Sequence, residues 1–237
     1  MNFASQTPGM DLNLAAIGRV SPKIWYNYYI DCNNYMPFQK NYLKKLYSIA
    51  ESQDGYFTSK QGLASGYSNR MQTYHMQNGD WIKEARGIFR LDSFPPVPKP
   101  ELMVWYLWSA NRAGEPQGIY SHETALDIYS LSSWASDKLN MTVPPGFQRM
   151  VIPPVLQLHR KRLSPDDVGI KYGVRVTKPL KTIIDCLKGE HVPRKYLQEA
   201  VAQAIEQQII LPIEIAKAHL TPKERKLLQS FIPEAVK

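Results

Sequence analysis

The side chains best suited to specific chemistry lie in the stretch NRMQTYHMQN, residues 69–78. Arginine donates paired hydrogen bonds to guanine, and asparagine or glutamine pairs in the same way with adenine. Helical spacing predicts two faces for this stretch. The inward face is expected to hold Met71, Tyr74 and His75, packed with Tyr67. The outward face is expected to hold Asn69, Arg70, Gln72, Thr73, Met76 and Gln77.

Neighbouring residues offer contacts to a phosphate backbone. Thr58 and Ser59 stand at an expected helix start, where hydroxyl groups and free backbone N–H groups can hold a phosphate. Ser68 is expected to cap the helix that follows it, beside the base-reading residues. Lys83, Arg86 and Arg90 lie in an expected hairpin and could contact phosphate or the minor groove. The set predicts an interface with double-stranded DNA.

The secondary structure expected around these side chains follows a recognisable order. Apolar spacing predicts a helix over residues 41–53, and Gly66 and Gly79 are expected to end the next two helices. The segment WIKEARGIFRL reads as a hairpin. This order predicts a winged helix-turn-helix over residues 41–93.

Other parts of the chain frame this unit. Residues 1–40 form a leader that is either a flexible extension or an arm that packs on a partner. Residues 94–100 are expected to be a proline-rich linker, because four prolines in SFPPVPKP cannot continue a helix or a central strand. Residues 101–237 alternate helical and strand patterns, which predicts a mixed α/β domain and an α+β fold class for the whole chain. Within it, Ser121 is expected to cap a helix.

Charge is concentrated in the second half. The chain has a net charge of +8, but residues 41–92 carry only +2. Residues 149–195 hold eleven Lys and Arg against four Asp and Glu, a net charge of +7. A second basic surface is therefore expected, formed by Arg160, Lys161, Arg162, Lys171, Arg175, Lys178 and Lys181.

Several segments resemble one bacterial family. The GYFT entry at 55–58, YHMQNGDW at 74–81 and RGIFRL at 86–91 are similar to the winged-helix domain of AbiEi-type antitoxins of type IV toxin–antitoxin systems. YSHETALDIYSLS, MTVPPG and VTKPLKTIIDCL resemble the second domain of the same family. The resemblance spans residues 42–190 and leaves the leader outside it.

The resemblance implies a transcriptional autorepressor that binds an inverted repeat in its own promoter. It also implies an antitoxin domain that counters an AbiEii-like nucleotidyltransferase toxin without forming a stable complex. The second basic surface would then extend the DNA contact or hold the nucleic acid on which the toxin acts, with RNA as one candidate. A solvated face without a partner is the alternative.

No enzyme motif is evident. Cys32 and Cys186 have no CxxC spacing, and phosphate-binding glycine loops, HExxH and GxSxG are absent, so no metal, cofactor or catalytic residue is expected. His159 has no carboxylate partner suggested by spacing, and the pair Asp166 and Asp167 falls in an expected turn. A cytoplasmic protein without membrane contact is expected. Two alternatives remain open: a nuclease targeted by the winged helix, and an adaptor whose winged helix binds a protein.

Overall fold

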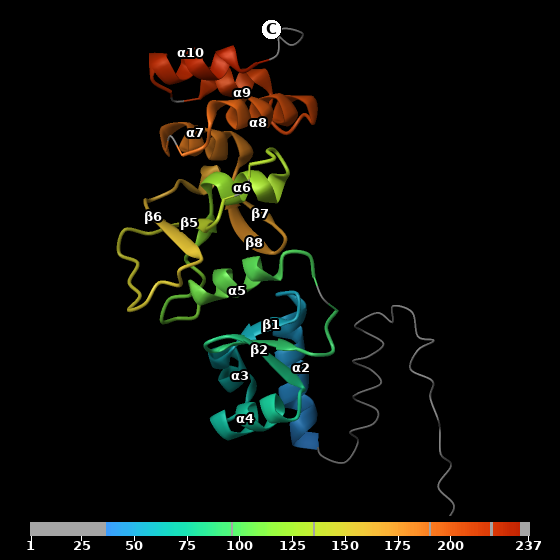
Figure 1. Ribbon diagram of the computed structural model, residues 1–237. Helices are drawn as coiled ribbons and strands as arrows, with labels where there is room; N and C mark the ends of the chain where they lie inside the picture. The colour runs from blue at the N-terminus through green and yellow to red at the C-terminus, as the bar shows by residue number, and fades with distance from the viewer. Residues whose placement is uncertain (1–36, 96, 135, 190, 219, 233–237) are drawn as a thin grey trace, which may run out of the picture.

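The structure is a computed structural model, which describes residues 37–95, 97–134, 136–189, 191–218 and 220–232 (Figure 1). Most of the leader therefore lies outside the described residues. Within these residues the fold combines helices with two separate sheets, and the α+β class is confirmed.

The first unit, residues 37–94, is built from six elements. These are α2 (Pro37–Glu51), β1 (Tyr56–Thr58), α3 (Ser59–Ser65), α4 (Asn69–Gln77), β2 (Trp81–Ala85) and β3 (Ile88–Leu91). The strands form an antiparallel sheet in the order β1-β3-β2. Its core is aromatic, because Phe57, Tyr67 and Phe89 all pack around the buried Trp81.

The second unit, residues 100–232, contains a mixed sheet of five strands. Its helices and strands start with α5 (Pro100–Trp108), β4 (Ile119–Tyr120), α6 (His122–Tyr129), β5 (Leu139–Val143) and β6 (Leu156–Arg160). A 3₁₀ turn (Pro165–Asp167), β7 (Val168–Lys171) and β8 (Val174–Thr177) follow. The strand order is β6-β5-β4-β8-β7, so β6 and β7 lie at opposite edges.

Helices complete this unit. They are α7 (Pro179–Gly189), α8 (Arg194–Glu206), α9 (Pro212–Lys217) and α10 (Pro222–Ser230). They gather at the end of the molecule farthest from the first unit (Figure 1). Their apolar faces share a core with α6, in which Leu126, Ile183 and Leu197 are buried. Burial on one face of each helix explains the helical apolar spacing in this part of the sequence.

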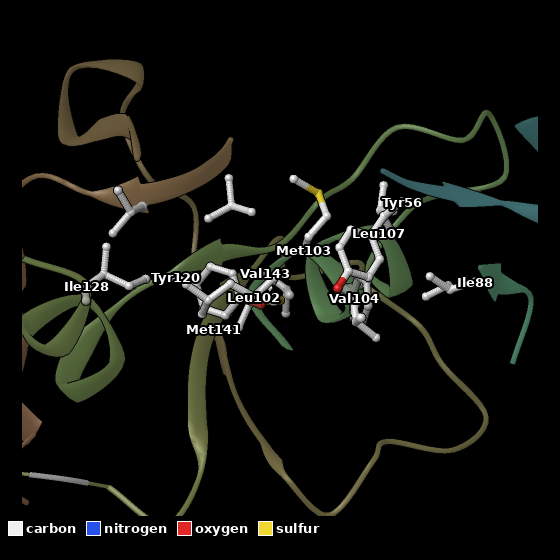
Figure 2. Close-up of a cluster of buried hydrophobic side chains, with 14 residues drawn as sticks. Tyr56, Ile88, Leu102, Met103, Val104, Leu107, Tyr120, Ile128, Met141 and Val143 are labelled. Atoms are coloured by element: carbon white, nitrogen blue, oxygen red, sulfur yellow. Dashed lines mark hydrogen bonds between the residues drawn. The ribbon is translucent and has the colours of Figure 1, made fainter. Parts of the chain in front are cut away.

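A continuous core joins the two units. Tyr56 and Ile88 of the first sheet lie in the same buried cluster as Leu102 and Met103 of α5 (Figure 2). Helix α5 lies between the first unit and the second sheet (Figure 1). On its other side, Tyr120 of β4 donates a buried hydrogen bond of 2.6 Å to the Leu102 carbonyl.

The proline-rich segment 94–100 is packed at its start. Phe94 is buried in the core of the first unit, where its ring lies 5.0 Å from that of Tyr47. Gly55 makes this packing possible, because a Cβ atom there would lie 2.5 Å from the Cβ of Phe94. Gly55 also has a φ of +90°, which L side chains rarely adopt.

Candidate nucleic-acid interface

Short-range capping fixes the positions of α3 and α4. Thr58 Oγ1 accepts from the Gln61 amide at 3.2 Å, and Gln61 Oε1 accepts from the Thr58 amide at 2.7 Å, which is a reciprocal capping box. Gly66 ends α3 in the left-handed conformation and lies against the Tyr42 ring. Ser68 then caps α4 through the Met71 amide. The predicted helix starts and the predicted end at Gly66 are confirmed.

Helix α4 presents a polar outer face. The exposed residues share neighbouring positions on the helix and are Asn69, Arg70, Thr73, Tyr74 and Gln77. The helix contains no acidic residue. Among the described residues, none forms a hydrogen bond or an ion pair with the Arg70 side chain. Its guanidinium group therefore remains available to a ligand.

The prediction that Gln72 faces outward is wrong. The side chain is only 3% exposed and lies between α4 and the start of α3. Its Nε2 donates to the carbonyls of Ser59 and Tyr67 at 3.1 and 3.2 Å, and its Oε1 accepts from Ser59 Oγ at 2.8 Å. A buried polar side chain is stable only with such partners, so Gln72 joins the two helices and does not reach a base.

The predicted inward and outward faces are also wrong at two other positions. Tyr74, predicted to lie in the core, is 56% exposed, whereas Met76, predicted to lie outside, packs partly against the core. His75 does face inward, where its ring stacks on Trp81 at 5.2 Å. The helix is therefore rotated by part of a turn from the orientation that apolar spacing suggests.

The β2–β3 hairpin carries exposed cations beside these helices. Lys83 and Arg86 are exposed and have no hydrogen bond or ion pair to another described residue. Arg90 is engaged, because its Nε donates to Glu84 at 3.0 Å. The Ser59 amide donates to the Gly87 carbonyl at 2.9 Å, which fastens the hairpin turn to the start of α3.

The predicted phosphate contact at Thr58 and Ser59 remains a prediction. Both hydroxyl groups take part in internal hydrogen bonds, Thr58 in the capping box and Ser59 with Gln72. The structure thus gives each of these hydroxyl groups a local structural role.

The second basic surface is divided by the sheet. Arg160 lies on the edge strand β6 and Lys171 on the opposite edge strand β7. Around β6, Lys161 and Lys181 converge on the buried Asp185. The structure therefore brings these two lysines together, whereas Arg160 and Lys171 lie on opposite edges of the sheet.

The other residues of the predicted second basic surface differ in the contacts that they make. Lys171 lies 4.9 Å from the centre of the Tyr129 ring, and Arg175 Nε donates to the Tyr106 hydroxyl at 3.1 Å. Arg162 and Lys178 are exposed. The aromatic contacts restrain Lys171 and Arg175. Arg160, Arg162 and Lys178 are therefore the members of this set that are most available to bind a polyanion.

A cluster that the sequence did not predict lies where α6 begins. The rings of His122 and His159 stack with their centroids 3.8 Å apart. His122 Nδ1 lies 2.9 Å from Ser121 Oγ, and His159 Nε2 lies 2.8 Å from Asn140 Oδ1. Spacing in the sequence gave no signal, because pairing of β4, β5 and β6 brings these histidines together.

Burial lowers the pKa of both imidazoles. Burial, the His159 ring and nearby lysines lower the pKa of His122 to about 4, although Asp185 opposes the change. Burial is the largest cause that lowers the pKa of His159. A cation in one stacked ring disfavours a second in the other.

The cluster lacks an accessible nucleophile. Ser121 is fully buried and accepts from Thr142 Oγ1 at 2.8 Å. The prediction that its side chain caps α6 is wrong: Ser121 occupies the N-cap position, but its hydroxyl makes no capping hydrogen bond.

Burial raises the pKa of the Cys186 thiol, which is 1% exposed. Within the described residues, no group of three or more His, Cys, Asp or Glu side chains could hold a metal ion.

Comparisons with known proteins give a weak structural similarity. No protein-family model matches the sequence, and a search of curated proteins found no match. The chain is similar in structure to the RV2827C protein from Mycobacterium tuberculosis, with a TM-score of 0.46 and 11% sequence identity. That similarity covers 81% of this chain and 72% of the other. Separately, no helix in the described residues has the length and apolar character needed to cross a membrane.

Proposed function

We propose that the protein is a cytoplasmic, DNA-binding transcriptional autorepressor, in which residues 41–93 act as a winged helix-turn-helix. In this arrangement α4 enters the major groove, which is wide enough for one helix, and the β2–β3 hairpin contacts the backbone as the wing. We further propose that the protein serves as the antitoxin of a type IV system against a nucleotidyltransferase-type toxin, as the resemblance of its motifs implies.

One observation carries the DNA-binding proposal. The outer face of α4 lacks acidic residues and presents Arg70 without a partner among the described residues, and the adjacent hairpin presents Lys83 and Arg86 in the same state. Cations left unpaired beside a polar helix face suit a polyanion whose base edges accept hydrogen bonds. Arg70, Asn69 and Thr73 would contact bases, and the hairpin cations would contact phosphates.

The test is a binding titration against the DNA upstream of the protein's own gene, beside a scrambled duplex, at two salt concentrations. Tight and salt-sensitive binding that prefers the native duplex is expected. Arg70→Ala should cost about 1–3 kcal/mol and relax preference at one base pair, whereas Arg86→Ala should weaken binding to all duplexes and lower the salt slope by about 1. Lys223→Ala, an exposed cation on α10, is the matched control and should change neither. Equal weak binding to both duplexes would refute the proposal.

The antitoxin role needs a separate assay. Co-production with a nucleotidyltransferase toxin from the same operon should restore bacterial growth. Arg70→Ala should still restore growth when both genes are driven from inducible promoters, because the second unit is proposed to counter the toxin. Failure of the wild-type chain to restore growth would refute the antitoxin role and leave the DNA-binding result standing.

A further inference from the structure

Tyr74 is the one large apolar side chain on the outer face of α4. It is 56% exposed, and it lies one helical turn after Arg70 on a face whose other members are polar. An aromatic ring in this position leaves apolar surface in water, which is unfavourable without a partner. We therefore expect the Tyr74 ring to contact a ligand in which an apolar group lies among hydrogen-bonding groups.

The Tyr74 ring is held in place from behind. It meets the His75 ring edge-on, with centroids 5.5 Å apart and an interplanar angle of 78°. His75 is itself fixed, because its Nδ1 lies 2.8 Å from Asp80 Oδ2 and its ring stacks on the buried Trp81. A restrained side chain loses less conformational entropy on binding than a mobile one.

The charges around this face select a nucleic acid as the occupant. Arg70, Lys83 and Arg86 are exposed without partners among the described residues, and α4 carries no acidic residue. In the major groove, the apolar group that projects among hydrogen-bonding atoms is the C5-methyl of thymine. Side chains on one helix face, a turn apart, meet neighbouring base pairs.

We propose that Tyr74 packs against a thymine C5-methyl group in the major groove, next to the base pair contacted by Arg70, and so determines part of the sequence specificity. This inference rests on the proposed DNA-binding function and deepens it. The ring supplies a methyl contact, and the arginine supplies hydrogen bonds.

The experiment replaces each thymine of the native upstream duplex by deoxyuridine, one position at a time, which removes only the methyl group. Burial of one such group contributes about 0.8 kcal/mol, so loss of the contact should weaken binding about fourfold. The wild-type protein should show this loss of affinity at one thymine in each half of the inverted repeat. Tyr74→Ala should bind the native and substituted duplexes equally at that position, and Tyr74→Phe should keep the discrimination.

Controls separate this inference from the function on which it rests. Tyr172→Ala removes a tyrosine of similar exposure, 48%, from the β7–β8 turn and should keep the methyl discrimination. Thermal unfolding of Tyr74→Ala should match that of the wild type, because the ring is exposed. If Tyr74→Ala still binds the native duplex more tightly than the deoxyuridine duplex at that position, the inference is wrong. It is also wrong if the wild-type protein prefers its own duplex but shows no such difference. Neither result would refute the DNA-binding function. If the wild-type protein does not prefer its own upstream duplex to the scrambled one, the DNA-binding function itself would be refuted.

Discussion

The role of Gln72 can be tested by removing its hydrogen bonds while keeping its volume. The side chain is 3% exposed and makes three hydrogen bonds, two to backbone carbonyls and one from Ser59 Oγ. Gln72→Met preserves the length of the side chain but removes both donors and the acceptor. Gln72→Ala also removes packing against Gly62, where an added Cβ atom would lie 3.2 Å from Gln72 Nε2.

The magnitude follows from the three lost bonds. A neutral hydrogen bond contributes about 0.5–1.5 kcal/mol, and a buried group left without its partner costs about 1–3 kcal/mol. Gln72→Met should therefore lower the free energy of unfolding by about 2–4 kcal/mol, and Gln72→Ala by somewhat more because it also leaves a void. This is a large part of the about 5–15 kcal/mol that stabilises a typical protein.

Urea unfolding followed by far-UV circular dichroism and tryptophan fluorescence measures the effect. With a urea dependence of about 1–3 kcal/mol per molar, the midpoint of the first unit should fall by about 1 M or more. Gln77→Ala is the matched control, because this glutamine is exposed on the same helix and its loss should change stability by less than about 0.5 kcal/mol.

DNA binding distinguishes this role from base reading. Below the unfolding transition, Gln72→Met should rank a panel of mismatched duplexes in the same order as the wild type. An unchanged urea midpoint together with an altered preference at an adenine would refute the reasoning, because it would place the amide in the groove.

Three other outcomes are expected. Thr58→Ala should cost about 1 kcal/mol in urea unfolding through loss of the α3 capping box, and Thr58→Ser should retain most of that stability. The lowered pKa values of His122, about 4, and of His159 mean that the unfolded chain takes up protons near pH 6.5 that the folded chain does not, so stability should be full above that pH and fall toward pH 4. The urea midpoint of His122→Asn should fall less steeply over this range, and an identical pH profile would contradict that assignment. In a Cys32→Ser background, the buried Cys186 should react with a thiol reagent at pH 8 only after unfolding, and rapid labelling of the native chain would contradict its burial.

Local signals in the sequence determined the helix starts and most of the secondary structure. Thr58, Ser68, Gly66 and Gly79 act through contacts within a few residues, so their roles could be predicted from the chain itself. The hairpin of residues 81–91 and the alternation of helical and strand patterns after residue 100 were also predicted from local patterns. The two-residue strand β4 and the short helix α9 were not, because neither is long enough to show a period.

The tertiary structure alone decided which side chains of α4 are free to bind. Apolar spacing treats glutamine as a surface residue and tyrosine as a core residue, but Gln72 is satisfied by carbonyls from α3 and the following turn, and Tyr74 is displaced outward. The stacked His122 and His159, and the pairing of Lys161 and Lys181 with Asp185, likewise depend on strand pairing and helix packing between distant segments. Composition could give the amount of charge in residues 149–195, but strand pairing and helix packing determine where that charge lies on the molecule.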